Sequence, residues 1–185
     1  MIVTRTTGSR LALSGLFILA GSAACTPGGQ PSHHERSHIR GVNLQLPRDL
    51  RKAPLVRIRN LLVLGPPEGQ TFAPNANAAV YATIIDSAAD GKADRLISVT
   101  SPKFHGPTQI TGGGIDLPYN QPVLLNAGGR PLVVMTGLTE QVRGGDWIPL
   151  TIGFKRAGST TITVQIVTHR GEYASLPPAP TTTGP

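Results

Sequence analysis

The chain has 185 residues and a formal net charge of +7, with 4% aromatic and 15% charged residues, 22 glycines and 17 prolines. Its length suits one domain with extensions at the ends. The charged fraction is below the roughly 25% that is usual for soluble domains, and glycine and proline are abundant. These values argue against a helical bundle and favour a loop-rich β domain. A single cysteine, Cys25, excludes an intrachain disulfide.

Residues 1–24 have the pattern of a secretory signal peptide. Arg5 and Arg10 stand in a segment without acids, and the apolar run 11–24 ends in small residues before Cys25. That run is shorter than the roughly 20 residues of a transmembrane helix. A cysteine at this place resembles a bacterial lipobox, so we expect lipidation at Cys25 and an exported protein anchored to the outer face of the cell membrane. The alternative is plain secretion with cleavage near Ala24.

Residues 25–54 are rich in proline, glycine, serine and charge, which is typical of a flexible linker. The linker contains three histidines within six residues, His33, His34 and His38. Imidazole suits copper, zinc and nickel, so this tract is a candidate for loose metal capture. The alternative is a polar linker that happens to contain histidine.

Basic residues gather between Arg36 and Arg59, with one acid, Asp49, among them; the seven are Arg36, Arg40, Arg48, Arg51, Lys52, Arg57 and Arg59. Such a stretch after a lipid anchor would lie beside anionic headgroups, each charge contributing about 1 kcal/mol near the surface. A solvated linker accounts for it equally well. Nucleic acid is not an expected partner, because the protein is exported and no aromatic residues are interleaved with the basic ones.

The folded domain is expected over residues 55–170. Apolar residues alternate with polar ones in several short segments, which is typical of strands with one buried face. Glycine-rich turn signals separate these segments, so the chain predicts seven or eight short strands in an all-β, antiparallel sandwich. The expected strands are 55–64, 79–85, 95–100, 122–126, 131–138, 147–154 and 159–167. The Pro- and Thr-rich tail 171–185 is expected to be disordered.

Catalysis is not expected from this domain. Its neutral-pH bases are His105 and His169, it has no G-x-S-x-G turn, and its aspartates fall mostly in predicted turns. The free thiol is assigned to lipidation. The sequence therefore predicts a protein that is not an enzyme.

Two segments together resemble the periplasmic copper chaperones called PCu(A)C, and especially their actinobacterial lipoprotein relatives. "VYATIIDSAADGKADRLISVTSP" (80–102) has the Y-x-T-I strand, the D-R-L and the final S-P. "GLTEQVRGGDWIPLTIGFKRAGSTTITVQIV" (137–167) has the G-L, the Gly-Asp turn and P-L-T-I-x-F-x-x-A-G. The resemblance covers roughly residues 55–167. It implies a cupredoxin-like Greek-key sandwich that holds Cu(I) and passes it to a respiratory oxidase.

The same resemblance implies a ligand set of a His-Met pair, a further Met, and a His-x-Met just before the G-L. Here His105 stands in the region of the first pair, without a Met. Met135 lies one residue from the place of the last methionine, and Arg130, Pro131 or Leu132 holds the place of its histidine. His105 and Met135 are thus the candidate copper ligands of the domain, with His33, His34 and His38 as further donors. The alternative for Met135 is a strand residue that packs in the core beside Val133.

Two functions follow, with the same fold and location. The first is a lipid-anchored copper chaperone that binds or buffers Cu(I) for an envelope or respiratory acceptor. The second is a lipoprotein of the same fold whose metal site is lost and which acts as a non-catalytic interaction module of the cell envelope.

Overall fold

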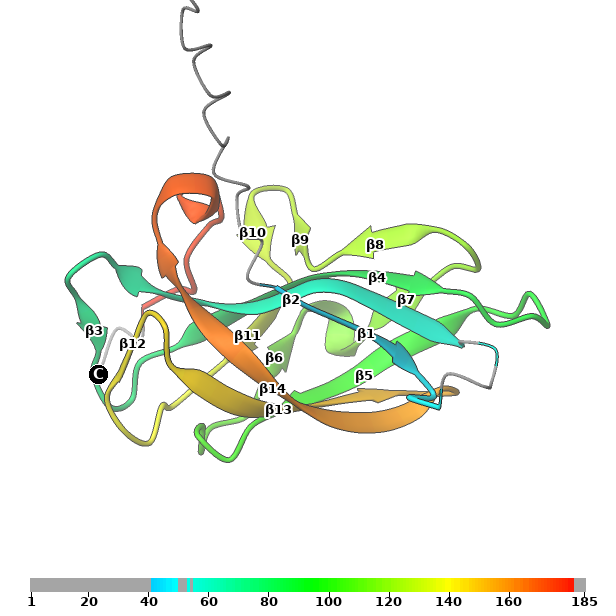
Figure 1. Cartoon of the computed structure of the whole chain (residues 1–185), viewed down its shortest axis with the longest axis horizontal. Helices are drawn as coiled ribbons and strands as arrows, with labels where there is room; N and C mark the ends of the chain where they lie inside the picture. The colour runs from blue at the N-terminus through cyan, green and yellow to red at the C-terminus, as the bar shows by residue number, and fades with distance from the viewer. Residues whose placement is uncertain (1–40, 50–52, 54, 182–185) are drawn as a thin grey trace, which may run out of the picture. The chain divides into compact units, whose positions relative to one another are not determined.

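The computed structural model describes residues 41–49, 53 and 55–181, which form strands and two short 3-10 helices (Figure 1). The elements in chain order are β1 (Val42–Leu46), β2 (Val56–Pro67), β3 (Thr71–Phe72), β4 (Ala78–Asp86), β5 (Asp94–Thr100), β6 (Gln109–Ile110), η1 (Thr111–Gly113), β7 (Ile115–Leu117), β8 (Pro122–Leu124), β9 (Asn126–Ala127), β10 (Arg130–Pro131), β11 (Val133–Met135), β12 (Val142–Arg143), β13 (Trp147–Phe154), β14 (Gly158–His169) and η2 (Gly171–Tyr173).

Most strands belong to one sheet, in the order β6-β11-β4-β2-β14-β13-β5-β7, with β1 added to β2 and β8 to β4. The main core contains residues from both halves of this order, including Val63, Val80, Leu96, Leu150 and Val164. The sheet therefore folds back on itself around one core, with β2, β4 and β8 along one side of Figure 1 and β5 and β13 along the other. The predicted all-β, cupredoxin-like sandwich is confirmed.

The alternation of apolar and polar residues produces the expected strands. Ile148, Leu150 and Ile152 of β13 are buried, and β13 pairs with β14 from Trp147↔Gln165 to Phe154↔Gly158. The described strands pair in antiparallel fashion with one exception, since β14 runs parallel to β2. This pairing joins the two halves of the sheet, and alternation along a single strand cannot predict it.

Strand β2 changes its pattern at Asn60. Before it, Val56 and Ile58 are buried while Arg57 and Arg59 are exposed. Asn60 has φ +52, a left-handed conformation that asparagine tolerates, and the register against β4 shifts there. The next residues, from Leu61 to Gly65, are all buried because both faces of the strand are covered.

The domain begins earlier than the sequence indicated. Strand β1 lies inside the range predicted as a linker, 25–54, yet it pairs with β2 through Leu44↔Ile58 and Leu46↔Val56. Leu46 is 2% exposed. The segment is short and stands among basic residues and prolines, so its alternation was not distinguished from a linker. The predicted domain boundary at residue 55 is corrected to β1.

The tail is also corrected. The sequence predicts disorder over residues 171–185, but in the described part, up to residue 181, η2 follows β14, and Tyr173, Leu176 and Ala179 pack on a second apolar cluster. Residues 182–185 lie outside the described residues. That cluster lies on the outer face of β2, β4 and β14 and consists of Leu62, Leu64, Ala79, Tyr81 and Val167. Proline does not prevent this packing, because an extended proline-rich backbone needs no internal hydrogen bonds.

The predicted signal peptide 1–24, Cys25, and the histidines His33, His34 and His38 lie outside the described residues. Within the described part of the chain, no helix has the length and hydrophobicity needed to span a bilayer.

Candidate metal-binding site

His105 is placed by a short backbone ladder beside the end of β11. Phe104 forms an antiparallel bridge with Leu138, and both side chains are buried in the main core. The N–H of His105 donates to the carbonyl of Gly137 at 2.9 Å, and the N–H of Gly106 donates to that of Thr136 at 3.0 Å. His105 is therefore held on a fixed backbone, with its side chain exposed.

The imidazole of His105 occupies space that a side chain at position 137 would need. A Cβ on Gly137 would lie 2.8 Å from Nε2 and 2.9 Å from Cε1 of His105, so the ring lies against the glycine. Gly137 also has φ +70, which L side chains rarely adopt. This turn interrupts the strand predicted over 131–138, so that Met135 and Leu138 both reach the core although they are three residues apart.

Met135 lies in the core. Its side chain is 0% exposed, it belongs to the same apolar cluster as Val133, and its backbone pairs with Ala78 of β4. The thioether is thus enclosed by apolar side chains. This is the arrangement that a packing role predicts.

The structure places the two candidate ligands of the domain in different surroundings. His105 and Met135 come from neighbouring segments, but the imidazole is exposed and the sulfur is buried in the core. Among the described residues, no three His, Cys, Asp or Glu side chains are close enough to hold a metal ion. His169 is bound elsewhere, its Nε2 lying 3.2 Å from the carbonyl of Ala174.

A hollow with both polar and apolar lining residues lies at the place of the His-x-Met pattern. It is lined by Gln109, Thr111, Gly129, Arg130, Pro131, Leu132 and Val134, and by Pro177, Pro178 and Pro180 of the C-terminal segment. The C-terminal segment thus closes over the outer side of β11. Sequence reasoning missed this contact, because it assigned the tail to disorder.

Tyr81 fixes the C-terminal segment to the sheet. Its hydroxyl donates to the carbonyl of Pro177, and Asn77 Nδ2 donates to the carbonyl of Pro180 at 2.9 Å. Burial raises the pKa of the Tyr81 phenol to about 12, because the charged phenolate is disfavoured away from water. The Tyr81 of the Y-x-T-I segment therefore has a structural role in this fold.

The two segments that carry the family pattern contact each other through Asp94. Its carboxylate accepts the N–H groups of Arg156 at 2.8 Å and Ala157 at 2.9 Å. Asp94 begins the D-R-L segment, and Ala157 belongs to the A-G turn between β13 and β14. Close by, Arg156 forms an ion pair with Asp90. The pKa of Asp90 is lowered, first by the backbone N–H of Lys92 and then by Arg156.

The family model LpqE-like, described as "Putative lipoprotein LpqE-like", matches residues 56–166. Among solved structures, a copper-bound PCuAC domain from PmoF2 is 26% identical, with a TM-score of 0.51 over 63% of this chain and 96% of that one. An apo PCuAC domain from PmoF1 is 22% identical, with a TM-score of 0.52 over 63% and 97%. The second likeness supports the fold alone. No curated protein matches the chain.

Proposed function

The chain belongs to the LpqE-like family, and from this premise we propose that it handles copper outside the cytoplasm, binding or buffering Cu(I) for an envelope or respiratory acceptor. The observation that carries the proposal is the 26% identity to a copper-bound PCuAC domain, 96% of which is covered. Copper is the cargo, and the role is non-catalytic.

The exposure of each candidate side chain decides which residues serve as copper ligands in this proposal. His105 is exposed on a rigid ladder and can donate an imidazole nitrogen to an arriving ion. Met135 cannot reach an ion at the surface without leaving the core. The further donors in the proposal are His33, His34 and His38, since imidazole is a ligand for copper. The set therefore differs from the His-x-Met arrangement that the resemblance implied.

A second candidate function is favoured by the hollow under the C-terminal prolines. Where the resemblance implies copper ligands, the chain has Leu132 and Val134 facing Pro177 and Pro178. A protein that kept the fold and lost the metal site would act as an interaction module of the cell envelope. Fold by itself does not decide between the two functions.

Anaerobic Cu(I) titration of the full chain against a competing chelator separates them. The copper proposal expects binding tighter than that of a generic histidine peptide. The His33, His34 and His38 triple change to alanine and the His105→Ala change should each weaken it. His169→Gln is the matched control, because His169 contacts Ala174 and is not a proposed ligand. Binding no tighter than the peptide, or equal loss in the control, would leave the interaction module as the function.

The location is proposed from Cys25. The lipoprotein description of the family and the signal-peptide pattern before Cys25 support a lipid anchor at the outer face of the cell membrane. Cys25→Ala should release the protein from membranes into the soluble exported fraction. Cys25→Ala protein that stays in the membrane fraction after high-salt and carbonate washes would contradict the anchor.

A further inference from the structure

One part of the outer sheet face is left open by the C-terminal segment. The segment covers the outer face at Leu62 and Tyr81, but the register continues beyond it. Arg59 lies opposite Thr83 of β4, which lies opposite Leu124 of β8. In the next row Gln45 of β1, Arg57 of β2, Ile85 of β4 and Pro122 of β8 lie side by side. Residues directly opposite in a sheet point to the same face.

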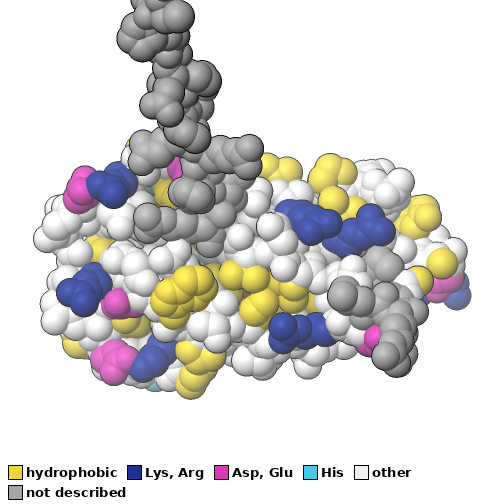
Figure 2. Space-filling model, in the orientation of Figure 1, with side chains coloured by type: hydrophobic (Ala, Val, Ile, Leu, Met, Phe, Trp, Pro, Cys, Tyr) yellow, Lys and Arg dark blue, Asp and Glu magenta, His cyan; other side chains and the backbone are white. Residues whose placement is uncertain are grey.

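We call this surface the arginine face: Gln45, Arg57, Arg59, Ile85, Pro122 and Leu124. Arg57 and Arg59 are exposed, and neither forms an ion pair or side-chain hydrogen bond within the described residues. Leu124 is 53% exposed and places a large apolar side chain beside the two arginines. Figure 2 shows basic side chains next to hydrophobic ones over the β1 and β2 region of the molecule.

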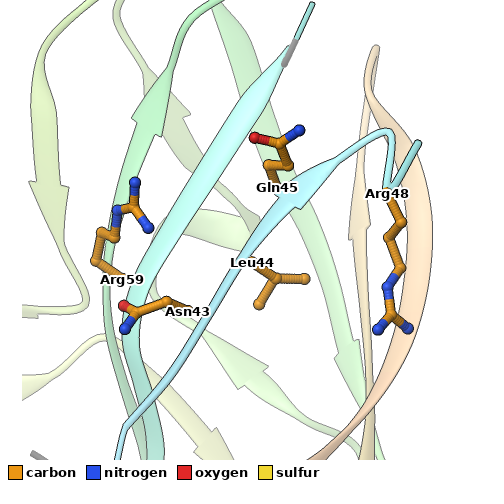
Figure 3. A pocket seen from close by; sticks show the side chains of 5 residues that line it. All are labelled: Asn43, Leu44, Gln45, Arg48 and Arg59. Carbon is orange, nitrogen blue, oxygen red and sulfur yellow. The ribbon is translucent and has the colours of Figure 1, made fainter. Parts of the chain in front are cut away.

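Strand β1 extends the positive charge toward β14. A shallow hollow beside β1 is lined by Asn43, Leu44, Gln45, Arg48 and Arg59. Figure 3 shows Arg59 near Asn43 on one side of β1 and Arg48 on the other side, toward β14. There Arg48 Nη1 lies 3.4 Å from the carbonyl of Thr161, a contact that leaves its charge unneutralised.

The acidic groups nearby are few. Asp49 follows Arg48 in the chain, Glu172 lines a hollow together with Leu124 at the border of the arginine face, and Asp86 is completely buried. None of the six residues of the arginine face is acidic. Cationic side chains beside exposed apolar ones are the combination that binds an interface of anionic headgroups and acyl chains.

We propose that the arginine face docks on the surface of an anionic phospholipid bilayer and sets the orientation of the domain at the membrane. Residues 26–41 separate Cys25 from β1, a length that reaches at most roughly 55 Å when fully extended. A bilayer is therefore within reach of this face if Cys25 carries an anchor. The docking itself does not depend on the anchor, so it goes beyond the proposed function.

The test measures binding of the full chain with Cys25→Ala to phosphatidylglycerol and phosphatidylcholine vesicles by co-sedimentation. Because residues 1–24 are the same in every variant, differences between variants in the preference for phosphatidylglycerol over phosphatidylcholine report the substituted positions. The paired change Arg57→Gln with Arg59→Gln should weaken that preference about tenfold or more. Arg130→Gln with Lys155→Gln removes the same charge from exposed positions outside the arginine face and should leave the preference nearly unchanged.

Two further variants keep the result decisive. Arg57→Lys with Arg59→Lys retains both charges and should retain binding, and Leu124→Gln should weaken the binding that remains at high salt. Equal behaviour of the two paired glutamine variants would overturn the proposal, since net charge alone would then explain binding. So would absence of a phosphatidylglycerol preference in the Cys25→Ala chain. Displacement by inorganic phosphate at matched ionic strength would reassign the face to small anions.

Discussion

Asp94 and Ala157 are joined by a hydrogen bond of 2.9 Å between a buried carboxylate and a backbone N–H. The same carboxylate accepts the N–H of Arg156 at 2.8 Å, and Asp94 is 6% exposed. The bond holds the turn of the β13–β14 hairpin against the start of β5. The bond therefore joins the D-R-L segment to the A-G segment.

Asp94→Ala should destabilise the domain by about 2–3 kcal/mol, because hydrogen bonds to a charged group are lost and two turn N–H groups are left without their acceptor. Urea unfolding followed by circular dichroism measures the change. Asp116→Ala is the matched control, since its ion pair with Arg95 is exposed and should be worth about 1 kcal/mol or less. If the two variants lost the same free energy of unfolding, the buried contact would contribute no more to stability than the exposed ion pair.

Tyr81 makes stability fall at alkaline pH. Its pKa is about 12 in the folded chain against 10.0 for an unperturbed phenol, so the folded state holds the proton more tightly. The stabilisation is fully present below pH 10 and is lost as pH rises from about 10 to about 12. Tyr81→Phe should therefore lose less stability than wild type across this interval, when unfolding is compared at several pH values. If the free energy of unfolding changed with pH in the same way in both proteins, the raised pKa of Tyr81 would be contradicted.

Tyr81→Phe also removes the hydrogen bond to Pro177. At neutral pH we expect a loss of about 1 kcal/mol and faster proteolytic cleavage within residues 173–181. Tyr119→Phe is the matched control, because Tyr119 is 45% exposed and does not contact that segment in the described structure. A C-terminal segment equally resistant in wild type and Tyr81→Phe would show that apolar packing alone holds it.

Gly137→Ala should destabilise the domain by about 1–3 kcal/mol, because alanine must adopt φ +70 and its Cβ meets the His105 ring. Thermal unfolding measures the effect. The double change with His105→Ala removes the ring contact but keeps the backbone strain, so it should recover less than half of the loss. Full recovery would mean that the imidazole, and not the backbone conformation, requires the glycine.

Met135→Leu should change stability by less than about 1.5 kcal/mol, since leucine nearly conserves the buried volume. Cu(I) affinity should not change, because the thioether is not at the surface. Met135→Ala should instead cost about 2–5 kcal/mol through the cavity it leaves. Chelator competition and urea unfolding on the same samples give both values. A large drop in Cu(I) affinity in a stable Met135→Leu protein would show that the core opens to a metal.

Local patterns were sufficient for much of the fold. Ile148, Leu150 and Ile152 alternate with Pro149, Thr151 and Gly153, and each of the three aliphatic residues is buried where the period of 2 places it. The same reasoning failed at Val42–Leu46 and at residues 171–181, where composition indicated linker and tail. Strand β1 is ordered by pairing with β2, including Leu44 with Ile58, and the C-terminal segment is ordered by Tyr81, which lies 96 residues before Pro177. Composition within each segment does not reveal either pairing.

The sequence by itself determined the all-β class, the strand-forming segments, the resemblance to copper chaperones and the two candidate ligands of the domain. Only the tertiary structure decided that His105 is exposed while Met135 lies in the core, and that prolines close over Leu132 and Val134. The physical reason is that side-chain direction depends on the turn at Gly137, and burial depends on which distant segment covers a face. Residue types name the possible chemistry, but packing decides which atoms can perform it.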